Sequence, residues 1–346
     1  TTVPVGFCLT CSPRFWREGS DLKFKGIQMA NDKIRSVVSM FSGVGGLDMG
    51  FEGNFEIHGK RIPRLPFKIV AAYEKDEKCV ETFRLNLRAP IRQRELNVSN
   101  INDIPKADLL IGGFPCQDFS SCGPKRGLDS ERGQLFEVMV KYLEKNRPSA
   151  FCAENVPNLG RMQKGEVLKY ITSRFESVGY RVKVWNLYAP DFGIPQTRRR
   201  LFIVGIRADI DGFPTEPVGK FKSSHRSIKW AIDDLKYIED ESIPNQSQYF
   251  KASVAKRGNG QGDEKSTADQ PGYTVRANAK SRVHFHYELE RRLTVRECAR
   301  LQTFPDSFTF PHSATSNIMQ IGNAVPPLLA NHVARVIAKF FEGRGL

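Results

Sequence analysis

Short apolar runs alternate with amphipathic segments over the first two-thirds of the chain. The apolar runs predict strands at residues 36–41, 67–73, 107–111, 150–153, 181–187 and 200–206. Helical spacing occurs just after residue 46 and at residues 76–87, 134–145 and 163–177. Strands that alternate with helices indicate a mostly parallel, doubly wound α/β sheet. Residues 52–66 carry glycine, proline and charge without periodicity, so we interpret them as a loop.

The pattern changes after Ile206. Residues 207–291 hold few long periodic segments and are rich in Gly, Ser, Asn and Lys, which indicates a second, smaller, loop-rich domain. Helical patterning returns from Arg292 onward, at residues 294–302 and again at residues 327–341. Residues 1–35 are interpreted as an N-terminal extension, expected to be flexible over its first part.

Charge adds information about partners. Over 346 residues, 52 Lys and Arg against 38 Asp and Glu give a net charge of +14, which favours a polyanionic partner such as nucleic acid. A merely basic protein remains the alternative. No apolar run approaches the roughly 20 residues that span a bilayer, so we expect no membrane association.

The cysteine count bears on redox state and on metal binding. Seven scattered cysteines, an odd number, fit reduced thiols in a cytoplasm better than a disulfide framework. Cys8 and Cys11 form a lone C-x-x-C pair without a second pair at ligand spacing, so no metal site is expected.

A glycine turn and an acidic residue follow the first two predicted strands. The turn is Phe41-Ser-Gly-Val-Gly-Gly46, and Glu74 ends the next strand. Such a turn lets a nucleotide-like ligand approach the backbone, and a carboxylate at the second strand end can accept hydrogen bonds from ribose hydroxyls. The alternatives are an ordinary tight turn and a solvated surface acid.

Cys116 and Glu154 follow two further strand ends. Cys116 stands between Pro115 and Gln117 on a rigid turn, where a thiolate would be presented as a nucleophile. The alternative is a buried, inert cysteine. A carboxyl group at Glu154 suits general acid work, or it caps a helix.

Two arginines precede the last predicted strand. With a period of two, Arg198 and Arg200 face the same side of the chain. Their guanidinium groups could hold a carboxylate, a phosphate or a base edge. The alternative is a solvated basic turn.

These segments, taken in order, resemble the DNA cytosine-C5 methyltransferase family, and the compact size resembles the bacterial restriction-modification enzymes. The resemblance covers the chain from about residue 36 to the end. It rests on Phe41–Gly46, Gly113-Phe-Pro-Cys-Gln117, Glu154-Asn-Val156, Gln196-Thr-Arg-Arg-Arg200, Arg292-Leu-Thr-Val-Arg-Glu-Cys-Ala-Arg-Leu-Gln302 and Gly322-Asn-Ala-Val-Pro-Pro327.

The resemblance implies a sequence-specific DNA methyltransferase. Cys116 would attack carbon 6 of a cytosine flipped out of the duplex, so that carbon 5 can take the methyl group of S-adenosylmethionine and leave S-adenosylhomocysteine. Glu154 would hydrogen-bond or protonate N3 of the ring. Arg198 and Arg200 would support the base and the nearby backbone.

The resemblance also implies binding residues and a domain plan. Residues 36–206 and 292–346 would form the cofactor-binding catalytic domain, and residues 207–291 the target-recognition domain. Ser120, Gln261 and Thr274 would contact DNA, with Gln261 filling the space that the flipped base leaves. The cofactor pocket would hold Phe41, Gly43, Val44, Gly45, Gly46, Glu74, Lys75, Asn97, Val98, Gly113, Pro115, Leu135, Asn323 and Val325.

The sequence departs from the family pattern at two cofactor positions. Ser39 stands where an acidic residue is usual before the glycine turn, and Asn97 stands where an aspartate usually contacts adenine. We therefore expect weaker cofactor binding, because the Asn97 carbonyl can accept the amine hydrogen bond but carries no charge.

Three other functions remain as alternatives. A tRNA cytosine-C5 methyltransferase is disfavoured by the insert at residues 207–291, and a non-catalytic DNA-binding homologue by Cys116, Glu154 and the two arginines. A dinucleotide oxidoreductase would explain only the glycine turn and Glu74. We expect a monomer that binds double-stranded DNA, lies in a prokaryotic cytoplasm at the nucleoid, and is paired functionally with a restriction endonuclease.

Overall fold

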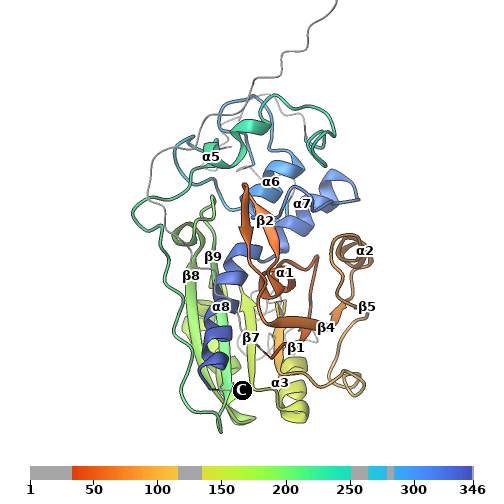
Figure 1. Ribbon diagram of the computed structural model, residues 1–346, viewed down its shortest axis with the longest axis vertical. Helices are drawn as coiled ribbons and strands as arrows, with labels where there is room; N and C mark the ends of the chain where they lie inside the picture. Colours follow the sequence, from red (N-terminus) through yellow and green to blue (C-terminus); the bar gives the residue numbers. More distant parts are fainter. Residues whose placement is uncertain (1–32, 116–134, 251–263, 279–283, 345–346) are drawn as a thin grey trace, which may run out of the picture. The chain divides into compact units, whose positions relative to one another are not determined.

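A seven-stranded sheet is built from strands between residues 35 and 207 (Figure 1). The computed structural model describes residues 33–115, 135–250, 264–278 and 284–344. The strand order is β5-β4-β1-β6-β7-β9-β8. The strands are β1 (Arg35–Met40), β4 (Phe67–Glu74), β5 (Ile91–Gln93), β6 (Leu109–Gly112), β7 (Ala150–Asn155), β8 (Tyr180–Tyr188) and β9 (Arg199–Arg207).

The sheet is mostly parallel, as the sequence predicts. β9 is antiparallel to both β7 and β8, and the other pairings are parallel. β1 pairs with β4 on one side and with β6 on the other, so the order of the strands reverses at β1. In open α/β sheets, ligands bind beyond the carboxyl ends of the strands at such a reversal. The glycine turn after β1 and residues 113–115 after β6 lie there.

Helices cover both faces of this sheet. One face carries α1 (Gly46–Glu52), α2 (Glu77–Asn86) and α8 (Pro327–Glu342), and the other carries α3 (Leu135–Asn146) and α4 (Glu166–Ser177). Short 3-10 turns lie at η2 (Pro157–Gly160), η3 (Met162–Gly165) and η4 (Ala189–Phe192). Strands buried on both faces are apolar throughout, which explains the continuous runs in β6 and β7.

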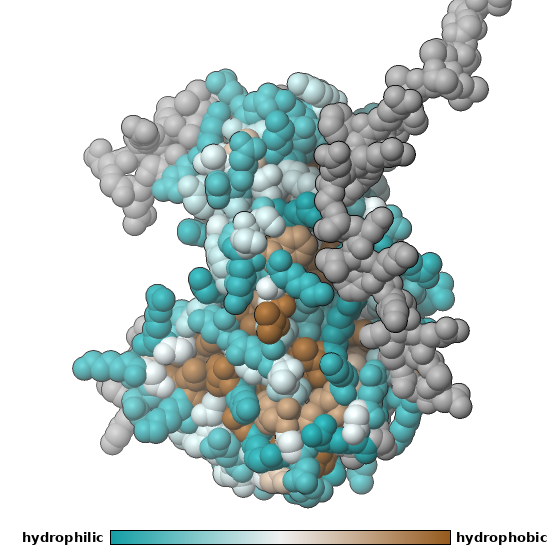
Figure 2. Space-filling view, turned by 60° about the vertical axis from the view of Figure 1, so that its left-hand side comes forward, coloured by the Kyte–Doolittle hydropathy of each residue, from teal (hydrophilic) through white to brown (hydrophobic). Residues whose placement is uncertain are grey.

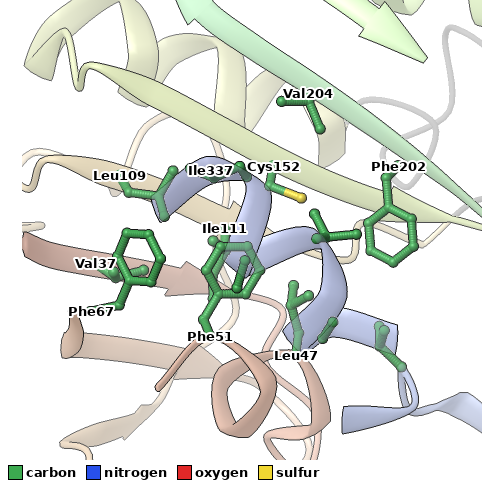
Figure 3. Packing of buried hydrophobic residues seen from close by; sticks show 14 of the residues in the cluster. Val37, Leu47, Phe51, Phe67, Leu109, Ile111, Cys152, Phe202, Val204 and Ile337 are labelled. Carbon is green, nitrogen blue, oxygen red and sulfur yellow. The ribbon is translucent and has the colours of Figure 1, made fainter. Parts of the chain in front are cut away.

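The core between the sheet and the first helix layer draws on residues far apart in the sequence. Figure 3 shows Val37, Ile111 and Cys152 of three neighbouring strands beside Phe51 of α1 and Ile337 of α8. Because α8 fills this face, the C-terminal segment is an integral part of the fold that holds the glycine turn.

Residues 52–66 form a hairpin, and our interpretation of them as a loop is wrong. β2 (Phe55–Ile57) pairs antiparallel with β3 (Lys60–Ile62) across a turn in which His58 and Gly59 have positive φ angles of 45° and 67°. Each strand is only three residues long, too short for alternation to stand out. The hairpin is fixed by packing, since Phe55 and Ile57 are buried in a third cluster with residues of the loop-rich region.

The loop-rich residues 207–291 contain α5 (Ile228–Ile232) and η5 (Asp233–Leu235), and α6 (Val295–Leu301) and α7 (Ala314–Asn323) follow them in the chain. An arginine side chain of α6 holds the neighbouring loops together. Arg296 donates to the carbonyl oxygens of Pro244, Pro305 and Phe308 at 2.7–2.8 Å. Buried main-chain carbonyls need such partners where no regular ladder supplies them.

The face drawn in Figure 2 is largely hydrophilic, with apolar side chains scattered among the polar ones. Among the described residues, none of the helices combines the length and the apolar character that a membrane crossing requires.

Candidate active site

The glycine turn is tied to Glu74 by main-chain hydrogen bonds. The Gly43 amide donates to Glu74 Oε2 at 2.9 Å, and the amides of Lys75 and Asp76 donate to Oε1 at 2.8 and 2.9 Å. A carboxylate offers about four acceptor positions, so three are in use. Glu74 therefore fixes the turn, and a ribose hydroxyl would have to use the remaining position or replace one of these amides.

The turn leaves room for a ligand on one side and none on the other. Gly43 has φ of +55°, and a Cβ added there would meet no atom within 4 Å. At Gly46 a Cβ would come within 2.3 Å of the Val325 carbonyl oxygen. Phe41, in front of the turn, has a φ of 57°, which is rare for a bulky residue and typical of functional sites. This open cradle fits a nucleotide-like ligand.

The adenine side of the expected pocket lies beyond β4 and β5. A cavity of about 450 Å³ is lined by Lys75, Asp76 and residues 93–95. The Val98 side chain is 46% exposed, so its apolar surface is open to a ligand ring. Asn97 Oδ1 accepts from the Ser99 amide at 2.9 Å, which leaves it one further acceptor position.

The C-terminal cofactor residues reach the same turn. Val325 is buried against Gly46, and Asn323 is exposed at the end of α7. Leu135 is half-buried at the start of α3. Val44 and Gly45 are buried within the turn itself, where Gly45 has a φ of 86°. The structure thus brings residues from both ends of the sequence to the glycine turn.

Glu154 lies at the end of β7 in a nearly closed environment. Arg200 Nε stands 2.6 Å from Glu154 Oε1 as an ion pair, and each side chain is 10% exposed. Burial raises the pKa of the Glu154 carboxyl, and the charges of Arg200 and Arg198 and a hydrogen bond from Arg200 oppose the rise. A carboxyl whose affinity for a proton is raised in this way suits a group that donates to a ring nitrogen.

Asn155 links this strand to the turn that carries Pro115. Its Nδ2 donates to the Phe114 carbonyl oxygen at 2.9 Å, and its Oδ1 accepts from the Val156 amide at 2.8 Å. A Cβ added at Gly113 would lie 3.3 Å from Glu154 Oε2. Residues 113–115 and the Glu154 carboxyl are therefore neighbours, as their positions at adjacent strand ends predict.

Arg198 is fully buried and bonds to main-chain carbonyls. Its Nη1 donates to Val275 O at 2.9 Å, and its Nη2 donates to Gly322 O at 2.7 Å and Ala324 O at 2.9 Å. Burial and the nearby Arg200 lower the pKa of Arg198, while Glu154 raises it. One arginine thus joins the loop-rich region to the segment that touches the glycine turn.

Of the three residues predicted to contact DNA, the structure describes only Thr274. The Thr274 hydroxyl donates to the Thr197 carbonyl oxygen, next to Arg198. Cys116, Ser120 and Gln261 lie outside the described residues, as do Cys8 and Cys11. In the described ranges, no group of three or more His, Cys, Asp or Glu side chains is arranged to hold a metal ion.

Sequence reasoning missed Asp48. This residue is 1% exposed in the first turn of α1, and neither carboxylate oxygen has a hydrogen bond of regular geometry. Burial raises its pKa to about 7. The signal that could have found it is an acid between Leu47 and Met49 on a helix that directly follows the glycine turn.

Comparison with known proteins identifies the family of the chain. The chain is 32% identical to the type II methyltransferase M.BsuRI of Bacillus subtilis over 95% of this chain and 85% of that protein. It is 32% identical to the type II methyltransferase M.MthTI of Methanothermobacter thermautotrophicus over 89% and 98%. A putative DNA modification methyltransferase from an E. coli prophage shares the fold at a TM-score of 0.61, with 23% identity over 89% of this chain and 99% of that one.

The fold is also shared with the S. pombe Dnmt2 methyltransferase, at a TM-score of 0.66 and 18% identity over 90% of this chain and 100% of that one. The family model of C-5 cytosine-specific DNA methylases matches residues 35–339. The chain therefore belongs to the C-5 cytosine-specific DNA methylase family and is a DNA cytosine-C5 methyltransferase.

Proposed function

We propose that this enzyme methylates a flipped-out cytosine of duplex DNA through a transient bond between Cys116 and carbon 6 of the ring. The observation that carries the proposal is the buried Glu154–Arg200 ion pair beside residues 113–115, directly before Cys116 in the sequence. Within the family, a buried carboxyl with a raised pKa beside residues 113–115 suits proton transfer to a pyrimidine.

The proposed chemistry balances at each step. Cys116 Sγ attacks carbon 6 as a thiolate while Glu154 gives its proton to N3, so the ring becomes an enamine that is nucleophilic at carbon 5. S-adenosylmethionine supplies the methyl group as an electrophile when it is bound. A base or water then takes the carbon 5 proton, the Cys116 thiolate leaves carbon 6, and N3 returns its proton to Glu154.

We assign different roles to the two arginines. Arg200 is proposed as a catalytic residue beside the base, because it pairs with Glu154 and shares its nearly closed environment. Arg198 is proposed as a positioning residue, because its Nη atoms are engaged with the carbonyls of Val275, Gly322 and Ala324. It would hold residues 207–291, through Val275, at a fixed position relative to residues 322–325.

The cofactor is proposed to bind at the glycine turn. Gly43 offers open space, Glu74 fixes the turn, and Val98 presents an exposed apolar surface to a ring. Asn97, Asn323 and Val325 are the further contacts that we propose. S-adenosylhomocysteine would occupy the same residues as the product.

Residues 207–291 are proposed to recognise the target sequence, with Thr274 on the DNA side. The net charge of +14 supports binding to the phosphate backbone. Because the relatives are named type II methyltransferases, we propose that this enzyme is the monomeric, cytoplasmic modification partner of a restriction endonuclease.

A covalent trap tests the mechanism. Duplex DNA that contains 5-fluorocytosine in the target site should form a stable adduct with the wild-type enzyme and S-adenosylmethionine, since fluorine cannot leave as a cation. Cys116→Ser should give no adduct, and Cys79→Ser, a cysteine on α2, should give the wild-type amount. An adduct that survives in Cys116→Ser would refute the assignment, and methyl transfer to tRNA alone would exclude DNA as the substrate.

A further inference from the structure

Asp48 is a buried acid that the proposed mechanism does not use. It lies in the first turn of α1, which starts directly after the glycine turn, and it is 1% exposed. Neither carboxylate oxygen has a hydrogen bond of regular geometry, and the Ser39 hydroxyl is the side-chain group that interacts with it. Because a buried carboxyl group without a compensating charge is costly to the folded state, its presence calls for a compensating role.

The acid lies beside the end of β1. The side chain of Ser39, which is fully buried, interacts with the Asp48 carboxyl by hydrogen bonding, and this interaction lowers the pKa of Asp48. The Ser39 Oγ also accepts a hydrogen bond from Ser42 Oγ at 2.8 Å. Ser39 occupies the position where the family resemblance leads us to expect an acid. The structure thus places a carboxyl group next to that position, but from a residue nine places later in the chain.

The charged groups around Asp48 oppose its ionisation. Glu52 on the same helix and Glu74 at the end of β4 both raise its pKa. β6, which also neighbours α1, carries no titratable residue in Leu109–Gly112. On α8, the His332 ring packs on Phe192 at 5.1 Å, and Arg335 bonds to Asn331 at 2.7 Å. The charges that act on Asp48 from the described residues are thus both negative, so a cationic ligand would meet an uncompensated acid.

We propose that Asp48 is the counter-charge for the cationic part of the cofactor, and that it releases its proton to solvent when the cofactor binds. The inference rests on the proposed use of S-adenosylmethionine. A carboxyl group that is neutral in the free protein becomes a carboxylate paired with a cation, and one proton leaves. The relocated acid would then replace the charge that Ser39 lacks.

Calorimetry measures the proton directly. Binding of S-adenosylmethionine is titrated at pH 6.5 in two buffers of different ionisation enthalpy, and the difference in binding heat gives the protons released. We expect between about half and one proton for the wild-type enzyme, because an acid with a pKa of about 7 is mostly protonated at pH 6.5. Affinity should fall about fivefold from pH 7 to pH 6.

Two further ligands identify the cation. S-adenosylhomocysteine keeps the ammonium group without the sulfonium charge, and 5′-methylthioadenosine has neither. Proton release with S-adenosylmethionine and S-adenosylhomocysteine, but not with 5′-methylthioadenosine, assigns the pairing to the ammonium group. Proton release with S-adenosylmethionine alone assigns it to the sulfonium group. Equal release with all three ligands would overturn the proposal.

Asp48→Asn is the decisive variant, since an amide has the shape of the protonated acid and should fold. It should bind the cofactor without proton release and with a flat pH profile, whereas Glu56→Gln, at an exposed position of β2, should behave as the wild type. Unchanged proton release in Asp48→Asn would overturn this inference and leave the proposed function standing. If the wild-type enzyme bound none of the cofactor-related ligands, the proposed function itself would fail.

Discussion

The side-chain amide of Asn155 holds the main-chain oxygen of Phe114 at 2.9 Å, two residues before Cys116. Both groups are buried, and the same Asn155 side chain also receives the Val156 amide. The end of β7 therefore fixes the position of residues 113–115, which follow β6 and directly precede the proposed nucleophile Cys116. Glu154 and residues 113–115 are positioned by adjacent residues of one strand.

Removal of this link should slow catalysis more than it weakens binding. We expect Asn155→Ala to lower kcat by roughly 10- to 100-fold, because a lost buried hydrogen bond costs about 1–3 kcal/mol and frees residues 113–115. Cofactor affinity should change less than threefold, since the glycine turn is untouched. Single-turnover methylation and cofactor titration measure the two effects. The exposed Asn158→Ala serves as the control, and an equal loss there would contradict the role of Asn155.

Glu154 should control the alkaline side of the pH–rate profile. Burial raises the pKa of Glu154, so the group is present as the acid at higher pH than a free carboxyl would be. Activity should fall as the pH rises through this pKa and the proton is lost. Glu154→Gln should lower kcat by about 100- to 10,000-fold and remove that dependence. A profile with the same alkaline limb in Glu154→Gln would assign the limb to another group.

Arg198 should contribute strongly to stability. Its replacement by lysine places all three donors on a single nitrogen, which cannot reach the carbonyls of Val275, Gly322 and Ala324 as the two separate Nη atoms do, and we expect a loss of roughly 2–4 kcal/mol in the free energy of unfolding. Denaturant titration measures this loss. The exposed Arg199, which lies 4.1 Å over the Tyr188 ring, gives the matched control. Arg199→Lys should cost less than about 1 kcal/mol.

Asp48 should destabilise the ligand-free enzyme at high pH. Its pKa is raised from 3.8 to about 7, so the folded state binds more protons than the unfolded state between these values. The free energy of unfolding therefore falls as the pH rises through that window. Asp48→Asn should be more stable than the wild type by roughly 2–4 kcal/mol at pH 8, and the difference should shrink towards pH 4. Thermal unfolding at both pH values checks this, and a constant difference would contradict it.

The sequence predicts the parts of the fold that depend on burial. Strands β6 and β7 lie within one or two residues of the predicted positions, because strands covered on both faces are apolar along their whole length. The hairpin at residues 55–62 could not be predicted in this way, since its packing partners lie in α5 and α6, far along the chain. α7 was missed for a similar reason: its buried positions include Ser316 and Asn317, which the sequence presents as polar.

For the site, the sequence predicts residue types at strand ends but not their partners. Glu154 lies beside residues 113–115 because β6 and β7 are adjacent parallel strands, whose carboxyl ends meet at one edge of the sheet. The contact between Arg200 and Glu154 depends on the antiparallel direction of β9, which no local sequence pattern specifies. The partners of Arg198 are main-chain carbonyls, which have no sequence signature. Cys116 and Gln261 remain predictions of residue role.

The contact between Gly46 and Val325 has a consequence for biosynthesis. The glycine turn leaves the ribosome nearly 280 residues before the segment that packs against it. We expect a nascent chain to be unable to hold the methyl donor until residues 322–342 have been released. A cell that makes this enzyme would then have no methylation from incomplete chains, and loss of α8 by a late stop codon would abolish donor binding as completely as loss of the turn itself.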